Sequence, residues 1–149
     1  MQRTLVLVKP DGVQRGFIGE IVGRFEGRGL KLIAMKMMRV TRELAARHYA
    51  EHQGKPFYEG LLTFITSGPI IAMIWEGREA VTVVRSLMGA TDPLRAGPGT
   101  IRGDLALDHG MNLIHGSDSP ARAEDEMALF FSASELHDYE RTSDRWIRE

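Results

Sequence analysis

The stretch RTLVLVKPDG, residues 3–12, decides how the fold is built. Its branched apolar residues follow one another without alternation, and the run is stopped by Pro10 and the turn signal Asp11-Gly12. This pattern predicts a buried strand over residues 3–9. A strand that is apolar on both sides belongs inside a sheet, so we expect it to be central.

Helical and extended patterns alternate through the rest of the chain. Apolar residues at helical spacing and cap residues such as Thr41 and Ser119 predict further helices, and apolar runs predict further strands. The expected helices cover residues 17–25, 44–52, 57–66, 78–89 and 120 to 130 or 131, and the expected strands cover 30–40, 70–75 and a short segment leading into His115. Residues 90–103 are predicted to be a loop, and the tail 132–149 shows no readable pattern.

This order of elements favours a compact α/β sandwich in which helices cover a small sheet, although it leaves the strand order open. The 149 residues contain no internal repeat, low-complexity tract or linker. We therefore expect one domain over residues 1–149.

The composition is that of a soluble globular protein, with 43% hydrophobic and 26% charged residues. A net charge of -1 argues against a dedicated nucleic-acid surface, so any anion site must be local. The chain has no cysteine, which excludes disulfides and thiolate zinc sites. Its N-terminal apolar run is too short for a signal segment or a membrane span, and we expect a cytoplasmic protein.

The usual phosphate-binding strings are missing, because neither a P-loop, nor a dinucleotide fingerprint, nor the protein-kinase motifs occur. If the protein handles phosphates, it must use side chains. The candidates near predicted loops are Lys9, Arg85 and Arg102, with the hydroxyl of Thr91. Taken singly, each cation is more simply explained as a solvated surface charge, but Lys9 ends a strand that is predicted to be buried.

The stretch NLIHGSDS, residues 112–119, places a histidine after an apolar run and before a turn rich in hydroxyls. His115 could be a structural residue, a metal ligand or a nucleophile, because a neutral imidazole suits all three roles. Gly116 permits unusual backbone angles, and Ser117 and Asp118 could orient the ring or bind an anion.

A competing pattern is HYAEH, residues 48–52, which matches the H-x-x-E-H arrangement of a class of zinc peptidases. On a helix, His48 and His52 would share one face. The same pattern also fits an exposed polar helix face.

Four blocks of the sequence together resemble nucleoside diphosphate kinase, in the order of that family: VKPDGVQRG (8–16), SGPIIAMIWEG (67–77), PGTIRGD (98–104) and NLIHGSDS (112–119). The resemblance runs from Arg3 to Glu149 and implies a ferredoxin-like fold, with a four-stranded antiparallel sheet covered by helices. It also implies a ping-pong transfer of the γ-phosphoryl group from a nucleoside triphosphate to a diphosphate, which maintains NTP and dNTP pools. The intermediate would be a phosphohistidine at His115. A nucleotide-binding module without catalysis is a further alternative.

The resemblance assigns a role to each site residue. Lys9, Arg85, Thr91 and Arg102 would contact the phosphates; Asn112 would reach the ribose and γ-phosphate; Ser117 and Glu126 would orient His115, with Tyr49 near the ring; Phe57 would stack on the base beside Leu61. Helical periodicity by itself does not choose between Glu124 and Glu126, and by itself it makes Tyr49 a core residue and Phe57 a helix-start anchor. Mg²⁺ would bridge the nucleotide phosphates with few protein ligands of its own.

Three positions depart from the residues that are frequent in the family, namely Asp92, His109 and Met111. They bear on nucleotide affinity and base preference. They do not bear on the reaction, because every position assigned to phosphoryl transfer matches. The family forms hexamers and, in some bacteria, tetramers. The loop DPLRAGPGT and the tail ending in WIRE resemble the hexameric type, so we expect a homo-oligomer, most simply a hexamer.

Overall fold

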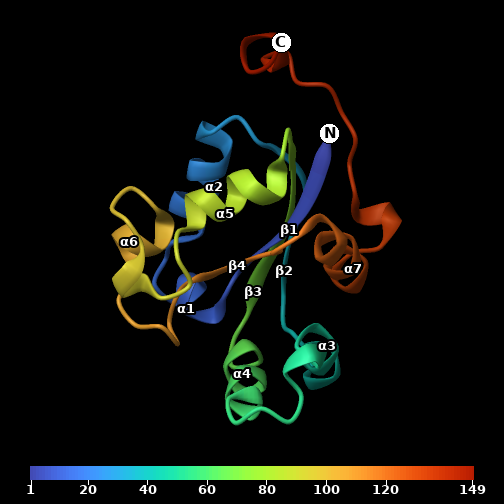
Figure 1. Ribbon diagram of the computed structural model, residues 1–149. Coiled ribbons are helices and arrows are strands. Elements are labelled where there is room, and N and C mark those ends of the chain that lie inside the picture. Colours follow the sequence, from blue (N-terminus) through green and yellow to red (C-terminus); the bar gives the residue numbers. More distant parts are fainter.

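The computed structural model describes all 149 residues and contains one antiparallel sheet with the strand order β2-β3-β1-β4 (Figure 1). The strands are β1 (Gln2–Val8), β2 (Lys31–Met38), β3 (Ile70–Gly77) and β4 (Ile114–Gly116). The predicted first strand is confirmed, and it is central because it pairs with both β3 and β4. The four-stranded antiparallel architecture expected for a ferredoxin-like fold is confirmed as well.

Helices cover both faces of this sheet and lie beyond one of its ends. The α-helices are α1 (Pro10–Gln14), α2 (Ile18–Gly27), α3 (Arg42–His48), α4 (Tyr58–Ile65), α5 (Ala80–Met88), α6 (Ile101–Leu105) and α7 (Pro120–Phe130). Short 3-10 helices are η1 (Ala50–His52), η2 (Pro93–Arg95), η3 (Ala133–Glu135) and η4 (Asp144–Trp146). No helix combines the length and the apolarity that a bilayer span requires.

Two cores explain the continuous apolar run of β1. Val6 and Val8 face a core shared with α2 and α5, whereas Leu5 and Leu7 face a second core shared with α3, α4 and α7. In Figure 1, α2 and α5 lie to the left of the sheet and α7 lies to its right. Every residue from Leu5 to Val8 is therefore fully buried.

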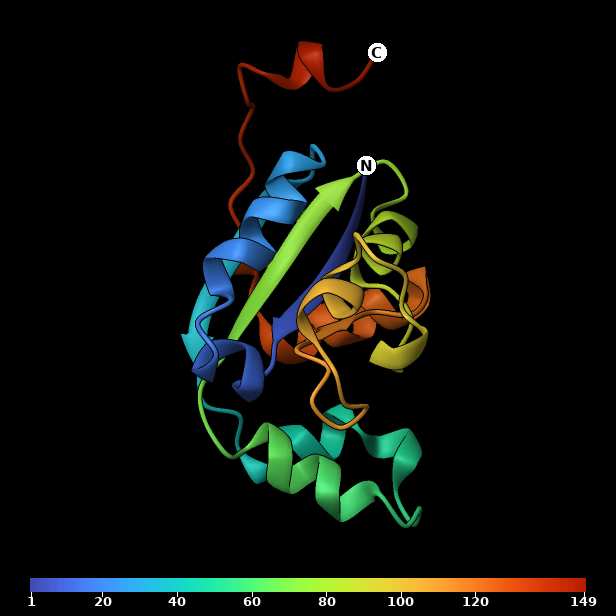
Figure 2. The same cartoon turned by 90° about the vertical axis from the view of Figure 1, so that its left-hand side faces the viewer.

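The two chain termini lie at the end of the sheet opposite α3 and α4. Figures 1 and 2 agree that α3 and α4 lie beyond one end of the sheet, and that the N-terminus and the C-terminal tail lie at the other. The tail follows the edge strand β2, since the His137 amide donates to the Ile33 carbonyl and Arg141 donates to the Leu30 carbonyl.

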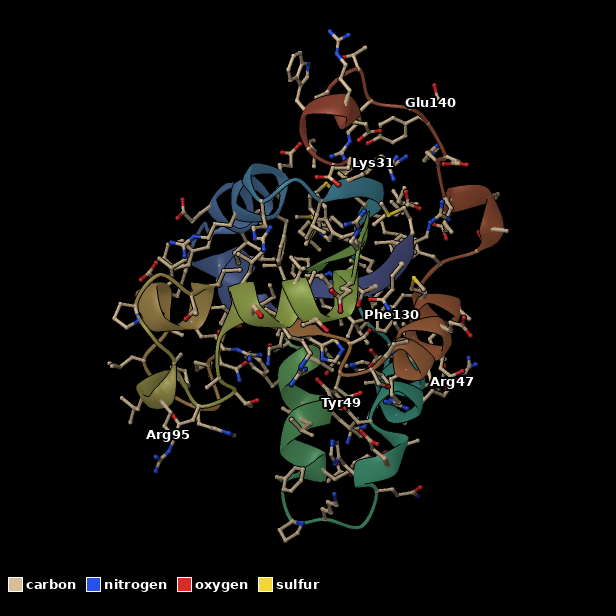
Figure 3. The ribbon with its side chains drawn as sticks, turned by 45° about the horizontal axis from the view of Figure 1, so that its top comes forward. Lys31, Arg47, Tyr49, Arg95, Phe130 and Glu140 are labelled. Atoms are coloured by element: carbon tan, nitrogen blue, oxygen red, sulfur yellow. The ribbon has the colours of Figure 1, made fainter.

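Three segments differ from the sequence prediction. The predicted turn at residues 10–12 is the start of α1, with Pro10 at its first position, where the missing N–H costs nothing. The predicted loop 90–103 contains η2 and the start of α6, which Thr100 caps by accepting from the Gly103 amide. The predicted helix 44–52 ends at His48, and η1 follows. Arg95, at the end of η2, projects away from the body (Figure 3).

Candidate active site

One cavity of about 670 Å³ gathers most of the predicted site residues. It is lined by Lys9, Tyr49, Phe57, Leu61, Thr91, Arg102, Asn112, His115 and Glu126. Two predicted residues do not line it. Ser117 is fully buried behind His115, and Arg85 lies in an adjoining depression, from which it donates to the Gly116 carbonyl at 3.5 Å.

His115 is the middle residue of β4 and pairs with Leu7 of the central strand. Its Nε2 lies 3.1 and 3.2 Å from the two carboxylate oxygens of Glu126. An ionised carboxylate only accepts hydrogen bonds, so this network assigns the ring proton to Nε2. The Nδ1 atom then keeps its lone pair, which makes it the nucleophilic atom of the ring.

Glu126 on α7 is held in its ionised form although only 3% of its side chain is exposed. Burial alone would raise its pKa, but hydrogen bonds from His115 and from Ser117 Oγ, at 2.6 Å, outweigh burial and lower the pKa to about 2. Glu124 is exposed on the same helix. Of the two glutamates that periodicity could not separate, Glu126 is the one that contacts His115.

His48 belongs to this cluster, and the sequence analysis missed its place there. Its buried ring meets His115 edge-on at 4.7 Å and also packs against Tyr49 and Phe130. Burial and the neighbouring His115 lower its pKa to about 3, so it is neutral at physiological pH. No local signal could have revealed this position, because the contacts come from β4 and α7.

Both sequence interpretations of HYAEH are corrected by this arrangement. His48 is buried rather than part of an exposed polar face, and α3 ends at this residue. Glu51 and His52 lie on η1, where Glu51 is 3.7 Å from His52 and 3.7 Å from Arg122. The peptidase arrangement fails because no single helix carries the two histidines.

Positive charge gathers where β1 ends. Burial, together with the charge of Arg102, lowers the pKa of Lys9 to about 8. Arg102 is buried and donates to the carbonyls of Gly89, Asn112 and Ile114, so it is not a solvated surface charge. Burial and the charge of Arg85 lower the pKa of Arg102 to about 10, which leaves it cationic. Positive side chains gathered at the end of β1 favour the binding of an anionic ligand there.

The backbone before His115 is strained and is held by two hydrogen bonds. Leu113 is buried at φ 73°, a conformation that is rare for a residue with a side chain. Its amide donates to Asp11 Oδ2 at 3.0 Å, and its carbonyl accepts from the Lys9 amide at 2.9 Å. These bonds hold the segment that enters β4 against the start of α1.

The expected role of Gly116 is wrong, because its φ is not in the left-handed region. The glycine is required by packing instead. A Cβ at this position would lie 2.5 Å from Met88 Sδ and 3.1 Å from Val84 Cγ1. An added methyl group would force the side chain of Met88 to move and would crowd Val84.

Most other assigned residues of the lining are aromatic or polar. Phe57, at the start of α4, is 51% exposed and lies edge-on to His52 at 5.3 Å. Burial and the charge of Glu126 raise the pKa of Tyr49 to about 12, so its phenol remains a hydrogen-bond donor. The side-chain amide of Asn112 donates to the Thr91 carbonyl at 2.9 Å, and its buried oxygen has no hydrogen-bond partner.

The departures at Asp92 and His109 have different positions. His109 is exposed and lines the cavity, whereas Asp92 caps η2 by accepting from the Leu94 amide. Only His109 is therefore placed to touch a ligand in this cavity.

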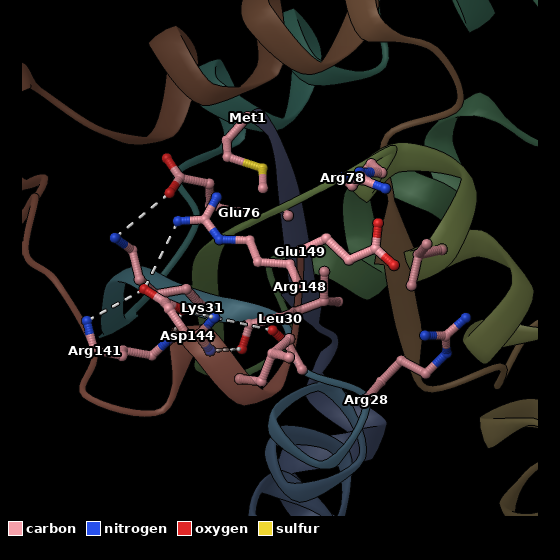
Figure 4. Close-up of a pocket in the computed structure, with 14 residues that line it drawn as sticks. Met1, Arg28, Leu30, Lys31, Glu76, Arg78, Arg141, Asp144, Arg148 and Glu149 are labelled. Carbon is pink, nitrogen blue, oxygen red and sulfur yellow. Dashed lines mark hydrogen bonds and ion pairs between the residues drawn. The ribbon is translucent and has the colours of Figure 1, made fainter.

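A second cavity, of about 330 Å³, lies between the ends of β2 and β3 and the C-terminal tail (Figure 4). It contains none of the predicted site residues. Its charges include internal pairs, with Arg141 at 2.7 Å from Asp144 and Lys31 at 3.5 Å from Glu76.

A nucleophilic imidazole nitrogen beside converging cations, on a ferredoxin-like sheet, defines a phosphotransferase. The family model described as nucleoside diphosphate kinase matches residues 2–136. The chain is 61% identical to nucleoside diphosphate kinase of Carboxydothermus hydrogenoformans, with 100% of both chains covered, and 56% identical to that of Archaeoglobus fulgidus, with 100% and 99% covered. The chain therefore belongs to the nucleoside diphosphate kinase family.

Solved structures agree with this assignment. The chain superposes with a TM-score of 0.98 on a halophilic nucleoside diphosphate kinase from Halobacterium salinarum in complex with CDP, at 57% identity and 99% coverage of each chain. A nucleoside diphosphate kinase family protein from Babesia bovis gives 0.97 at 49% identity, with 99% and 100% covered. The chain is a kinase that transfers a phosphoryl group from a nucleoside triphosphate to a nucleoside diphosphate, and it needs a divalent metal ion for this reaction.

Proposed function

We propose that the transfer runs in two halves through Nδ1 of His115. In the first half, the Nδ1 lone pair attacks the γ-phosphorus, and the bond to the β-phosphate oxygen breaks. The diphosphate leaves, and a second diphosphate attacks the phosphohistidine to restore the free ring. The observation that carries this proposal is the contact of Nε2 with Glu126, because it fixes the proton on the other nitrogen.

We assign the phosphates to the cationic end of the cavity. Lys9 and Arg102 would bind them directly with the Thr91 hydroxyl, and Arg85 would reach them from the adjoining depression. At about 4 Å and an effective dielectric near 20, each unit charge contributes roughly 4 kcal/mol. This attraction would offset the charge of the departing diphosphate. Asn112, whose buried oxygen lacks a partner, would accept from the ribose.

The nucleobase would occupy the outer end of the cavity. The half-exposed ring of Phe57 would stack on it, with Leu61 on the next turn of α4. Stacking accepts every base because each has a π face. Tyr49 would donate from its protonated phenol close to His115, while Ser117 and Glu126 would keep the ring oriented.

Mg²⁺ is the metal ion that we propose for the reaction. The cavity fits an ion that arrives with the nucleotide, because its lining offers few free oxygen ligands. Glu51 is paired with Arg122, and Glu126 lies between two imidazoles, which Mg²⁺ does not favour as ligands. Asp118 is an exposed carboxylate of the lining without an ion pair, so it would hold the ion from the protein side. When bound, Mg²⁺ would neutralise charge on the phosphates.

We also propose that residues 1–149 act as one domain of a cytoplasmic homo-oligomer, most simply a hexamer and otherwise a tetramer. Apolar side chains support self-association where the monomer leaves them uncovered. They include Met35 and Met37 on the edge strand β2, Leu94 on η2 and Trp146 in the tail. The complete absence of cysteine suits a reducing compartment. Light scattering on the purified chain distinguishes six subunits from four.

Phosphate exchange between ATP and a second diphosphate tests the central proposal. His115→Ala should abolish exchange and labelling, with an unchanged circular dichroism spectrum. His52→Ala is the matched control, because His52 lines the same cavity without a contact to Glu126. An alanine variant at 115 that still exchanges phosphate would overturn the assignment. Nucleotide binding without any labelling of the wild type would favour a non-catalytic module.

A further inference from the structure

His48 has buried polar atoms that the phosphoryl transfer does not use. Both of its ring nitrogens lie inside the protein without a hydrogen bond. Its Nδ1 is 3.5 Å from Glu126 Oε2, but the geometry is not that of a hydrogen bond. A buried polar group left unpaired costs about 1–3 kcal/mol. An imidazole in this position is open to another partner.

The partner is suggested by the two groups that His48 faces. Glu126 Oε2 is 3.1 Å from His115 Nε2 and 3.5 Å from His48 Nδ1, and the three groups offer ligand atoms that lie within 4.8 Å of one another. Two ligands of a tetrahedral zinc ion, with bonds of about 2.0–2.1 Å, lie roughly 3.3 Å apart. The two contacts to Glu126 lie on either side of that separation, and the two imidazoles, whose ligand atoms lie within 4.8 Å of each other, would close on the ion.

We propose that His48, His115 and Glu126 form a binding site for Zn²⁺, which inhibits the enzyme by occupying Nε2 of His115. Two imidazoles and one carboxylate are a donor set that zinc takes with its fourth position open. All three residues line the large cavity, so an ion can reach them from solvent. Magnesium prefers oxygen ligands and does not compete for two imidazoles.

The free ligand atoms favour coordination. Both ring nitrogens of His48 lack a hydrogen bond, and Oε2 of Glu126 faces both imidazoles. His115 must change its tautomer. Its single N–H moves from Nε2 to Nδ1, which frees the Nε2 lone pair for zinc. Ser117 keeps its bond to the other oxygen of Glu126, which holds the carboxylate in place.

Inhibition follows from this tautomer. A ring protonated on Nδ1 has no lone pair with which to attack phosphorus. The inhibition rests on the proposed role of Nδ1, whereas zinc binding itself does not. Zinc bound to the imidazole of His48 would thus control the reactivity of His115.

Zinc binding is tested on the untagged, nucleotide-free protein. After equilibration with zinc sulfate and desalting, elemental analysis should find about one zinc per chain. A chromophoric chelator should show affinity at least tenfold lower in His48→Phe, which keeps an aromatic ring among the same neighbours. His52→Phe is the matched control and should bind zinc as the wild type does. Equal affinity in His48→Phe, or equal loss in both variants, would overturn the site.

Two further measurements do not depend on a variant that folds. Nitrogen NMR of the wild-type histidines should show the His115 proton moving from Nε2 to Nδ1 when one equivalent of zinc is added. In a single turnover with ATP and Mg²⁺ after desalting, the zinc-loaded chain should be phosphorylated at least tenfold more slowly than the zinc-free chain. Unchanged His115 signals would contradict the site. Unchanged phosphorylation of a zinc-loaded chain would contradict the inhibition, while failure of the zinc-free chain would count against the proposed function alone.

Discussion

Replacing Glu126 with glutamine removes one charge beside the reacting ring and keeps the shape of the side chain. When Nδ1 bonds to phosphorus, the ring becomes cationic with its proton still on Nε2, 3.1 Å from the carboxylate. At an effective dielectric near 20, a unit charge at this distance contributes about 5 kcal/mol. The amide oxygen still accepts a hydrogen bond, so we expect it to retain roughly half of this stabilisation.

Glu126→Gln should therefore slow the phosphorylation of His115 by about 2–3 kcal/mol, or roughly 30- to 150-fold. The assay is rapid-quench labelling with ATP in a single turnover, which separates the first half-reaction from product release. Glu124→Gln is the control, since that carboxylate is exposed on the same helix and should leave the rate unchanged. A rate for Glu126→Gln within twofold of the wild type would refute the electrostatic role of the carboxylate.

Three other perturbations test separate parts of the site. Because burial and the charge of Arg102 lower the pKa of Lys9 to about 8, its ammonium group loses its charge as the pH rises through 8. The kcat/KM should fall above that pH, and Lys9→Arg should move the decline to higher pH; an identical profile in the variant would contradict this role. Gly116→Ala should destabilise the protein by about 1–3 kcal/mol in calorimetry, since the new Cβ would lie 2.5 Å from Met88 Sδ. Phe57→Ala should raise KM about 5- to 150-fold for all bases alike, as expected when a stack of about 1–3 kcal/mol is lost, and an effect on one base only would argue against stacking.

The sequence predicted the features that depend on local pattern. The unbroken apolar run of residues 5–8 predicted a central strand, because a strand covered on both faces has no polar alternation. Ser119 and Pro120 predicted the start of α7, and the serine accepts from the Arg122 amide as an N-cap. The start of α1 at Pro10 was missed, although proline is frequent at a first helical position.

Features that depend on distant contacts could not be predicted from pattern. Arg102 is buried because its acceptors lie at residues 89, 112 and 114, which meet only in the folded chain. His48 reaches His115 through the packing of α3 against α7 and β4. Periodicity could not choose Glu126 over Glu124, because the choice depends on how α7 is rotated over the sheet. The resemblance to a known family supplied what periodicity could not.

The position of the phosphoryl group on the protein is the most direct test of the account. Wild-type protein incubated with ATP and Mg²⁺ should carry one acid-labile phosphate, and phosphorus and nitrogen NMR should locate it on Nδ1 of His115. A phosphate on Nε2, on another histidine such as His48 or His52, or the absence of any covalent phosphate during active exchange, would contradict it.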